Sequence, residues 1–114
     1  MNKNLKLIVN NNFKDKEENY FFEKEELKTI LDLYAKMVSQ GLWKDYGLAI
    51  SKKQVGFSVF KNSAESAVYK IIKNFNPNNK NLKYLITDSS GKIFKNSSNL
   101  KDLLKSINWK KLQR

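Results

Sequence analysis

The chain has 114 residues, no histidine and no cysteine, and 22 Lys and Arg against 11 Asp and Glu, which gives a formal net charge of +11. Without histidine no imidazole base titrates near neutral pH, and without cysteine there is no thiolate nucleophile, disulfide or soft metal site. Composition therefore excludes much catalytic chemistry and indicates that the chain is not an enzyme. Nothing in it implies a cofactor or a small-molecule substrate.

The positive charge is concentrated after residue 32. Residues 1–32 contain six Lys and seven acids, whereas residues 33–114 contain fifteen Lys, one Arg and four acids. Charge separated in this way creates a local positive field that attracts anions. A compositional origin is an alternative, because 21 of the basic residues are Lys and Asn occurs fifteen times, as in a genome rich in A and T. Arg, whose planar fork recognises guanine and phosphate, is nearly absent, so sequence-specific base readout is not expected.

One domain is expected, because a chain of this length can bury a single core without disulfides. The predicted division is a flexible N-terminal arm over residues 1–20, an α+β domain over residues 21–110 and a tail over residues 111–114. Alternating Leu5, Leu7 and Val9 leave open an additional edge strand in the arm. The apolar run near the start is too short for a signal peptide or membrane span, and together with the missing cysteine this indicates a cytoplasmic protein with no membrane insertion.

An amphipathic helix is predicted over residues 23–40. Its apolar positions recur at the i, i+3, i+4, i+7 spacing, and we expect this stripe, Leu31 included, to face the core. The stripe comprises Leu27, Ile30, Leu31, Tyr34, Met37 and Val38. Glu23 and Glu26 stand at the two positions of a capping box, and Gly41 marks the end of the helix.

Beyond Gly41 the apolar period changes to two, which predicts a run of short strands. These strands are expected over residues 46–50, 55–60, 67–75, 82–87 and 92–95. A second helix follows over residues 99–108, with Asn99 as its N-cap and an apolar stripe made of Leu100, Leu103, Leu104 and Ile107. The predicted fold class is α+β, an antiparallel four- to five-stranded β-meander flanked by an N-terminal and a C-terminal helix in the order α-β-β-β-β-β-α.

Several motifs along this framework together resemble a known family. They include Trp43-Lys44-Asp45-Tyr46, Phe57-Ser58-Val59-Phe60-Lys61, Tyr69-Lys70-Ile71 and Gly91-x-Ile93-Phe94-Lys95. Over about residues 22–104 their combination is similar to the alphaproteobacterial family of domain of unknown function 2794. The resemblance implies a bacterial cytoplasmic protein and carries no activity or site residues. The chain departs from this family in having Lys where the relatives mix in Arg.

Basic and aromatic residues of the predicted sheet form the candidate binding site. Lys on phosphates and exposed Tyr on bases would suit a single-stranded nucleic acid, bound without sequence preference, or another polyanion. The candidate residues are Lys52, Lys53, Lys61, Lys70, Lys73, Lys83, Lys95, Tyr69 and Tyr84. Any half-solvated sheet shows a similar pattern, so a purely structural role is the alternative.

Two interpretations also stand for the segment that begins at Trp43. It is either a platform on which a base stacks or a core anchor that closes the first helix over the sheet. The acids after residue 32 lack the spacing of a carboxylate pair or a metal site, so no catalytic or metal-binding residue is predicted. The alternative function is a protein-interaction or self-assembling, homo-oligomeric module. Exposed aromatics among Lys would favour nucleic acid, and an apolar patch with few charges would favour a protein partner.

Overall fold

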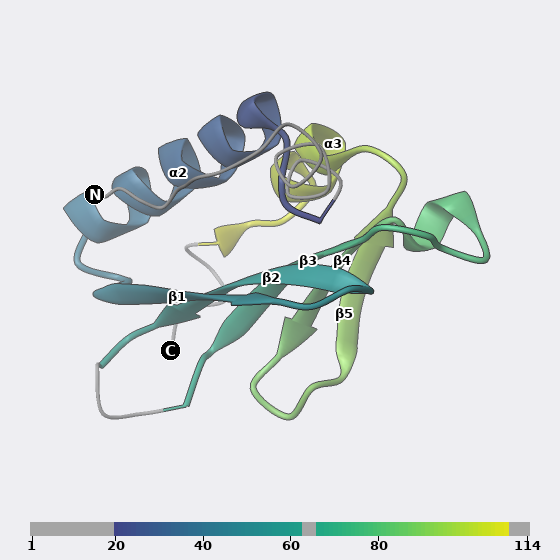
Figure 1. Ribbon diagram of the computed structural model, residues 1–114. Coiled ribbons are helices and arrows are strands. Elements are labelled where there is room, and N and C mark those ends of the chain that lie inside the picture. Colours follow the sequence, from purple (N-terminus) through teal and green to yellow (C-terminus); the bar gives the residue numbers. More distant parts are fainter. Residues whose placement is uncertain (1–19, 63–65, 110–114) are drawn as a thin grey trace, which may run out of the picture.

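The computed structural model describes residues 20–62 and 66–109. Its elements are α2 (Lys24–Ser39), β1 (Asp45–Ile50), β2 (Gln54–Phe60), β3 (Tyr69–Asn74), the 3-10 turn η2 (Lys80–Leu82), β4 (Tyr84–Asp88), β5 (Ile93–Ser97) and α3 (Leu100–Lys105). The five strands form one antiparallel sheet in chain order, and both helices lie on the same side of it (Figure 1). The predicted class and meander are confirmed. The expected arm, apart from Tyr20, and the expected tail lie outside the described residues.

Helix α2 begins and ends at the predicted signals. The Glu26 carboxylate accepts the backbone N–H of Glu23 at 2.6 Å, as in a capping box. At the other end Gly41 has a φ of 76°, a left-handed conformation that glycine adopts without the strain of a Cβ. The Leu42 N–H bonds to the Met37 carbonyl at 2.9 Å, the long hydrogen bond of a Schellman motif. The chain thereby reverses from α2 into β1.

The hydrophobic core lies between the helices and one face of the sheet. Residues directly opposite each other in an antiparallel pair point to the same face. Phe57 of β2 is opposite Ile71 of β3, which is opposite Ile86 of β4, and this row is fully buried. The predicted stripe of the second helix is buried against it and comprises Leu100, Leu103, Leu104 and Ile107.

The apolar stripe of α2 is wider than the core beneath it. Ile30 and Met37 are buried, but Leu31 is 37% exposed and Val38 is 39% exposed. Both lie on the helix beside Tyr34, whose ring meets Tyr46 of β1 at a centroid distance of 5.1 Å. The expectation that Leu31 packs in the core is wrong, because periodicity identifies the apolar flank of a helix but not how far the sheet extends under it.

Candidate functional site

Two of the predicted site residues, Lys73 and Tyr84, lie in a buried cluster beneath α2. The Lys73 ammonium donates to Glu26 Oε1 at 2.7 Å and to the backbone carbonyl of Phe21 at 3.3 Å, and the Tyr84 hydroxyl donates to Glu26 Oε2. Lys73, Tyr84 and Glu26 are 7%, 5% and 9% exposed. They join α2 to β3 and β4, so Lys73 and Tyr84 offer no surface to a nucleic acid.

The environment of this cluster fixes its protonation. Burial on its own raises the pKa of the Glu26 carboxyl, but hydrogen bonds from Lys73, Tyr84 and the Glu23 N–H outweigh burial and hold that pKa below its ordinary value of 4.5. Burial and the hydrogen bond to Glu26 raise the pKa of Tyr84 far above its usual range. At neutral pH the cluster is therefore a carboxylate that accepts hydrogen bonds from an ammonium and a neutral phenol, as in a structural ion pair.

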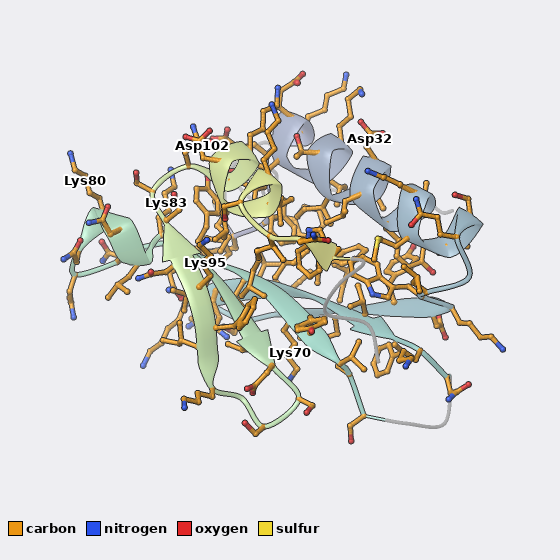
Figure 2. All side chains as sticks on the ribbon, turned by 180° about the vertical axis from the view of Figure 1, so that it is seen from behind. Asp32, Lys70, Lys80, Lys83, Lys95 and Asp102 are labelled. Carbon is orange, nitrogen blue, oxygen red and sulfur yellow. The ribbon has the colours of Figure 1, made fainter. Side chains whose placement is uncertain are left out.

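Lysines from two segments, the β1–β2 turn and η2 with the residue after it, gather at one end of the sheet. The backbone carbonyl of Lys53 accepts the N–H of Phe75 at 3.0 Å, and that of Lys83 accepts the N–H of Asn74 at 2.8 Å, so these two lysines flank the end of β3. The N–H of Lys83 in turn bonds to the Lys80 carbonyl at 3.1 Å. Figure 2 shows Lys80 and Lys83 together at the η2 end of the molecule. The basic end of the sheet comprises Lys52, Lys53, Lys80 and Lys83.

The remaining predicted residues are scattered. Lys70 lies on the sheet face turned away from the helices, opposite Thr87. Tyr69 faces the helices and packs on Trp109 at a centroid distance of 5.4 Å. Lys95 stands on the edge strand β5, and Lys61 directly follows β2. Of the nine candidates, the fold thus brings Lys52, Lys53 and Lys83 together at the surface, where it adds Lys80, and Lys73 and Tyr84 together in the buried cluster.

Of the two interpretations that the sequence allowed for Trp43, a stacking platform or a core anchor, the structure agrees with the core anchor. It is 1% exposed and packs edge-to-face on Trp109 at a centroid distance of 5.4 Å. A side chain buried to this degree cannot stack on a base. Its neighbour Tyr46, in contrast, is 45% exposed.

Tyr46 belongs to a surface feature that the sequence did not predict. Along β1, Tyr46, Leu48 and Ile50 are 45%, 45% and 60% exposed, although their register with β2 turns them to the helix-covered side of the sheet. They remain exposed because α2 covers Phe57 and its neighbours but leaves the outermost strand open. We call this surface the β1–α2 strip, and it comprises Leu31, Val38, Tyr46, Leu48 and Ile50.

Aromatic contacts make the strip continuous. The ring of Tyr46 is stacked on Phe57 at a centroid distance of 4.9 Å, and Tyr34 meets both rings edge-on, at 5.1 Å from Tyr46 and 5.8 Å from Phe57. Tyr34 thus fills the angle between α2 and β1, with Leu31 and Val38 on either side of it along the helix. The helix flank and the strand present one apolar surface rather than two isolated ones.

Strand β1 is also an edge of the sheet, since among the described residues it pairs with β2 alone. The Ser51 N–H donates to the Gln54 carbonyl at 2.9 Å. Because the ladder of an antiparallel pair alternates, the backbone groups of Leu48 and Ile50 then point away from β2, toward the open edge. Apolar side chains beside outward-facing backbone donors and acceptors are typical of an edge that can accept another strand.

Charges flank the strip but do not enter it. The stretch from Tyr46 to Ile50 has no ionisable group other than the Tyr46 phenol. Asp45 stands before it, where its carboxylate accepts the Tyr46 N–H at 2.8 Å, and Lys52 and Lys53 follow it in the turn to β2. Lys44 stands next to Asp45, so the strip is apolar in the middle, with a Lys–Asp pair at one end and two lysines at the other.

The described residues form a small α+β domain with one antiparallel sheet, helices on one face, a buried ion pair between the layers and an apolar edge at β1. Residues 20–104 match the family model described as protein of unknown function DUF2794, and the chain belongs to this family. No curated protein and no solved structure matches the chain.

Two further kinds of site are missing from the part of the chain that the structure describes. None of its helices has the length and apolar character needed to cross a membrane. Over residues 20–62 and 66–109, no group of three or more acidic side chains is arranged to hold a metal ion.

Proposed function

We propose that this protein is an interaction module that docks a polypeptide along the β1–α2 strip and acts by binding rather than catalysis. One observation carries the proposal: of the eight large apolar side chains that the described residues leave exposed, five lie on the strip. Single exposed apolar residues are ordinary, whereas a contiguous group of them marks an interaction surface. A sequence without His or Cys supports a role without catalysis.

The backbone of β1 adds direction to this surface. An incoming strand can bond to the outward N–H and C=O groups of Leu48 and Ile50 while its own apolar side chains pack against Leu31 and Val38. Main-chain hydrogen bonds would then supply affinity, and the apolar strip would select which face of the strand turns inward. The setting that we propose is the cytoplasm of an alphaproteobacterium, supported by the family motifs and the cysteine-free composition.

Site-specific photo-crosslinking in cells tests this function. A benzoylphenylalanine residue in place of Ile50 should crosslink the chain to another polypeptide, because Ile50 is the most exposed member of the strip. The matched control is the same residue in place of Ile93, which is 51% exposed but lies on the opposite edge strand, β5. Adding Val38→Lys, which places a charge in the strip, should remove the crosslink at position 50. Equal crosslinking at both positions, or none at position 50, would contradict the proposal.

A polyanion at the basic end is the second candidate function, favoured by the four lysines that the backbone brings together there. Residues 44–97 carry ten Lys and three acids, and Lys73 is held by Glu26, so most of this charge faces solvent. A single-stranded nucleic acid or another polyanion could be held by such a group through its phosphates alone. Few exposed aromatics stand beside these lysines, which is why we rank this function second.

Salt dependence tests the second function. If four phosphates are neutralised, log affinity for a single-stranded oligonucleotide should fall with log salt at a slope of about −2.8, so that fourfold more salt weakens binding roughly fiftyfold. Lys52→Glu with Lys53→Glu should weaken binding and lower the slope, while Lys101→Glu with Lys105→Glu on α3 should change the slope little. Fluorescence anisotropy measures both. Equal losses from the two pairs would show non-specific attraction, and no binding at low salt would remove this candidate.

A further inference from the structure

We propose that the polypeptide docked on the β1–α2 strip is a second copy of this chain, with the two β1 strands paired antiparallel about a two-fold axis. This inference rests on the proposed function and names its partner. Leu48 lies opposite Leu48 of the second copy in this arrangement, and Tyr46 lies opposite Ile50 of the second copy. The two sheets then continue into one another across the axis, with both α2 helices on the same side.

The backbone of β1 permits this register. In an antiparallel pair, residues that exchange both hydrogen bonds lie directly opposite each other. The residues of β1 whose backbone N–H and C=O groups point toward the open edge are two positions apart. A two-fold axis at Leu48 therefore places each of them opposite another such residue of the second copy. The Tyr46 N–H currently donates to the Asp45 carboxylate, and transfer of that N–H to the Ile50 carbonyl of the second copy would release Asp45.

The side chains of β1 permit it as well. Residues opposite each other share a face, so Tyr46, Leu48 and Ile50 of both copies gather on the helix-covered side, where Leu31 and Val38 of each α2 extend the apolar surface. Complete burial of the strip in both copies would remove on the order of 800 Å² from water. A stable interface buries about 1,200–2,000 Å², and the strand edges and helix flanks add to the side-chain area.

Charge gives the strip a preferred partner orientation. Lys44 and Asp45 stand at one end of β1 and Lys52 and Lys53 at the other. Antiparallel pairing about Leu48 places Asp45 of one copy opposite Ser51, and Lys44 opposite Lys52, of the second copy, so a neutral Lys–Asp pair meets the two lysines of the turn, and the same contact forms twice. Parallel pairing would instead place Asp45 beside Asp45 and the lysines beside lysines, which is unfavourable.

The opposite edge of the sheet does not offer a matching surface. The register between β4 and β5 shifts at Ile86 and Thr87, so β5 carries an irregularity of the kind that blocks strand addition. Lys95 also stands in the middle of β5, whereas β1 has no charge between Tyr46 and Ile50. Pairing of β1 with β5 of another copy is thus disfavoured, and pairing of β1 with β1 remains.

Sedimentation equilibrium of the full chain tests the inference. The wild-type protein should fit a dimer at concentrations in the range of about 10–200 μM. Ile50→Lys should give a monomer, while the matched change Ile93→Lys on β5 should leave the dimer intact. Far-ultraviolet circular dichroism checks that each variant is folded. A wild-type monomer at about 200 μM, or equal loss from the two variants, would overturn the inference.

A charge exchange tests the orientation separately. Asp45→Lys alone should weaken the dimer about tenfold or more, because two positive charges then face Lys52 and Lys53 twice. Lys52→Asp with Lys53→Asp alone should weaken it less, because Lys44 offsets the repulsion between Asp45 and the new carboxylates. Mixing the two variants should restore pairing, and native mass spectrometry should show the mixed dimer in excess over both homodimers. A statistical mixture would exclude the antiparallel arrangement.

The two proposals fail in different ways. If position 50 crosslinks to a different protein and the purified chain is monomeric, the strip is an interaction surface but its partner is not a second copy. If position 50 gives no crosslink in cells and the chain is monomeric, both proposals fall.

Discussion

Replacing Lys73 with alanine should lower the free energy of unfolding by about 3–5 kcal/mol, because it leaves the Glu26 carboxylate buried without its cation. The ammonium is the partner of Glu26 Oε1 at 2.7 Å, and both side chains are about 10% exposed or less. The carboxylate cannot easily reach water, since Tyr84 holds its second oxygen beneath α2. Urea denaturation followed by circular dichroism measures the loss.

An exposed ion pair in the same helix supplies the control. Lys28 and Asp32 also form a salt bridge, at 3.0 Å, but their side chains are almost 70% exposed. Lys28→Ala should therefore cost less than about 1 kcal/mol. Replacing both buried partners, with Glu26→Leu and Lys73→Met, should recover much of the stability lost in the single variant. A loss at Lys73 no larger than that at Lys28 would show that the buried pair does not stabilise the fold.

Acid should reveal the same cluster. The pKa of Glu26 is lower in the folded protein than its ordinary value of 4.5, so the unfolded chain binds more protons below that value. The stability that ionised Glu26 contributes is fully present above its unfolded pKa and is lost as the pH falls through its folded pKa. The difference in stability between the wild type and Glu26→Gln should therefore shrink on acidification below about pH 4.5.

Trp43→Ala should cost about 3–5 kcal/mol, through lost burial and the cavity that the indole leaves. Trp43 packs between Tyr34 of α2 and Trp109, which follows α3, so its removal opens the space where both helices meet the sheet. Phe94→Ala is a suitable control, because Phe94 is also aromatic but is 44% exposed on β5. That change should cost about 1 kcal/mol or less.

Thermal and urea denaturation of the two variants measure this contrast. Similar losses at Trp43 and Phe94 would mean that Trp43 does not anchor the core. The Trp43 result also bears on function, since a residue that closes the core is not available to stack on a nucleic-acid base.

Local signals predicted most of this fold. The change of apolar period at Gly41 separated helix from sheet, and the ends of each predicted strand lie within two residues of those of an observed strand. Turn chemistry set the ends correctly as well, for example at Gly91, whose φ of 88° closes the turn before β5. Such signals act over a few residues, so they are readable without knowing which segments meet.

The candidate site was harder to predict, because it depends on which segments meet. One part of it was predictable from β3. Side chains alternate between the two faces of a strand, so Lys73, two residues after Ile71, points to the same buried face. The partner that compensates its charge, Glu26, is 47 residues away and could not be identified by spacing. The exposure of Leu48 and Ile50 depends on β1 being an edge strand, which follows from the order of strands in the sheet rather than from β1 itself.

The agreement between strand order and chain order also has a kinetic consequence. Each strand pairs with its neighbour in sequence, so the sheet can grow by closing short loops of low entropic cost. Glu26, in contrast, meets Lys73 and Tyr84 across 47 and 58 residues of chain. We therefore expect the sheet to form before α2 docks on it. Contacts formed after the transition state slow unfolding without speeding folding. The buried ion pair would thus govern how long the native state lasts, not how fast it is reached.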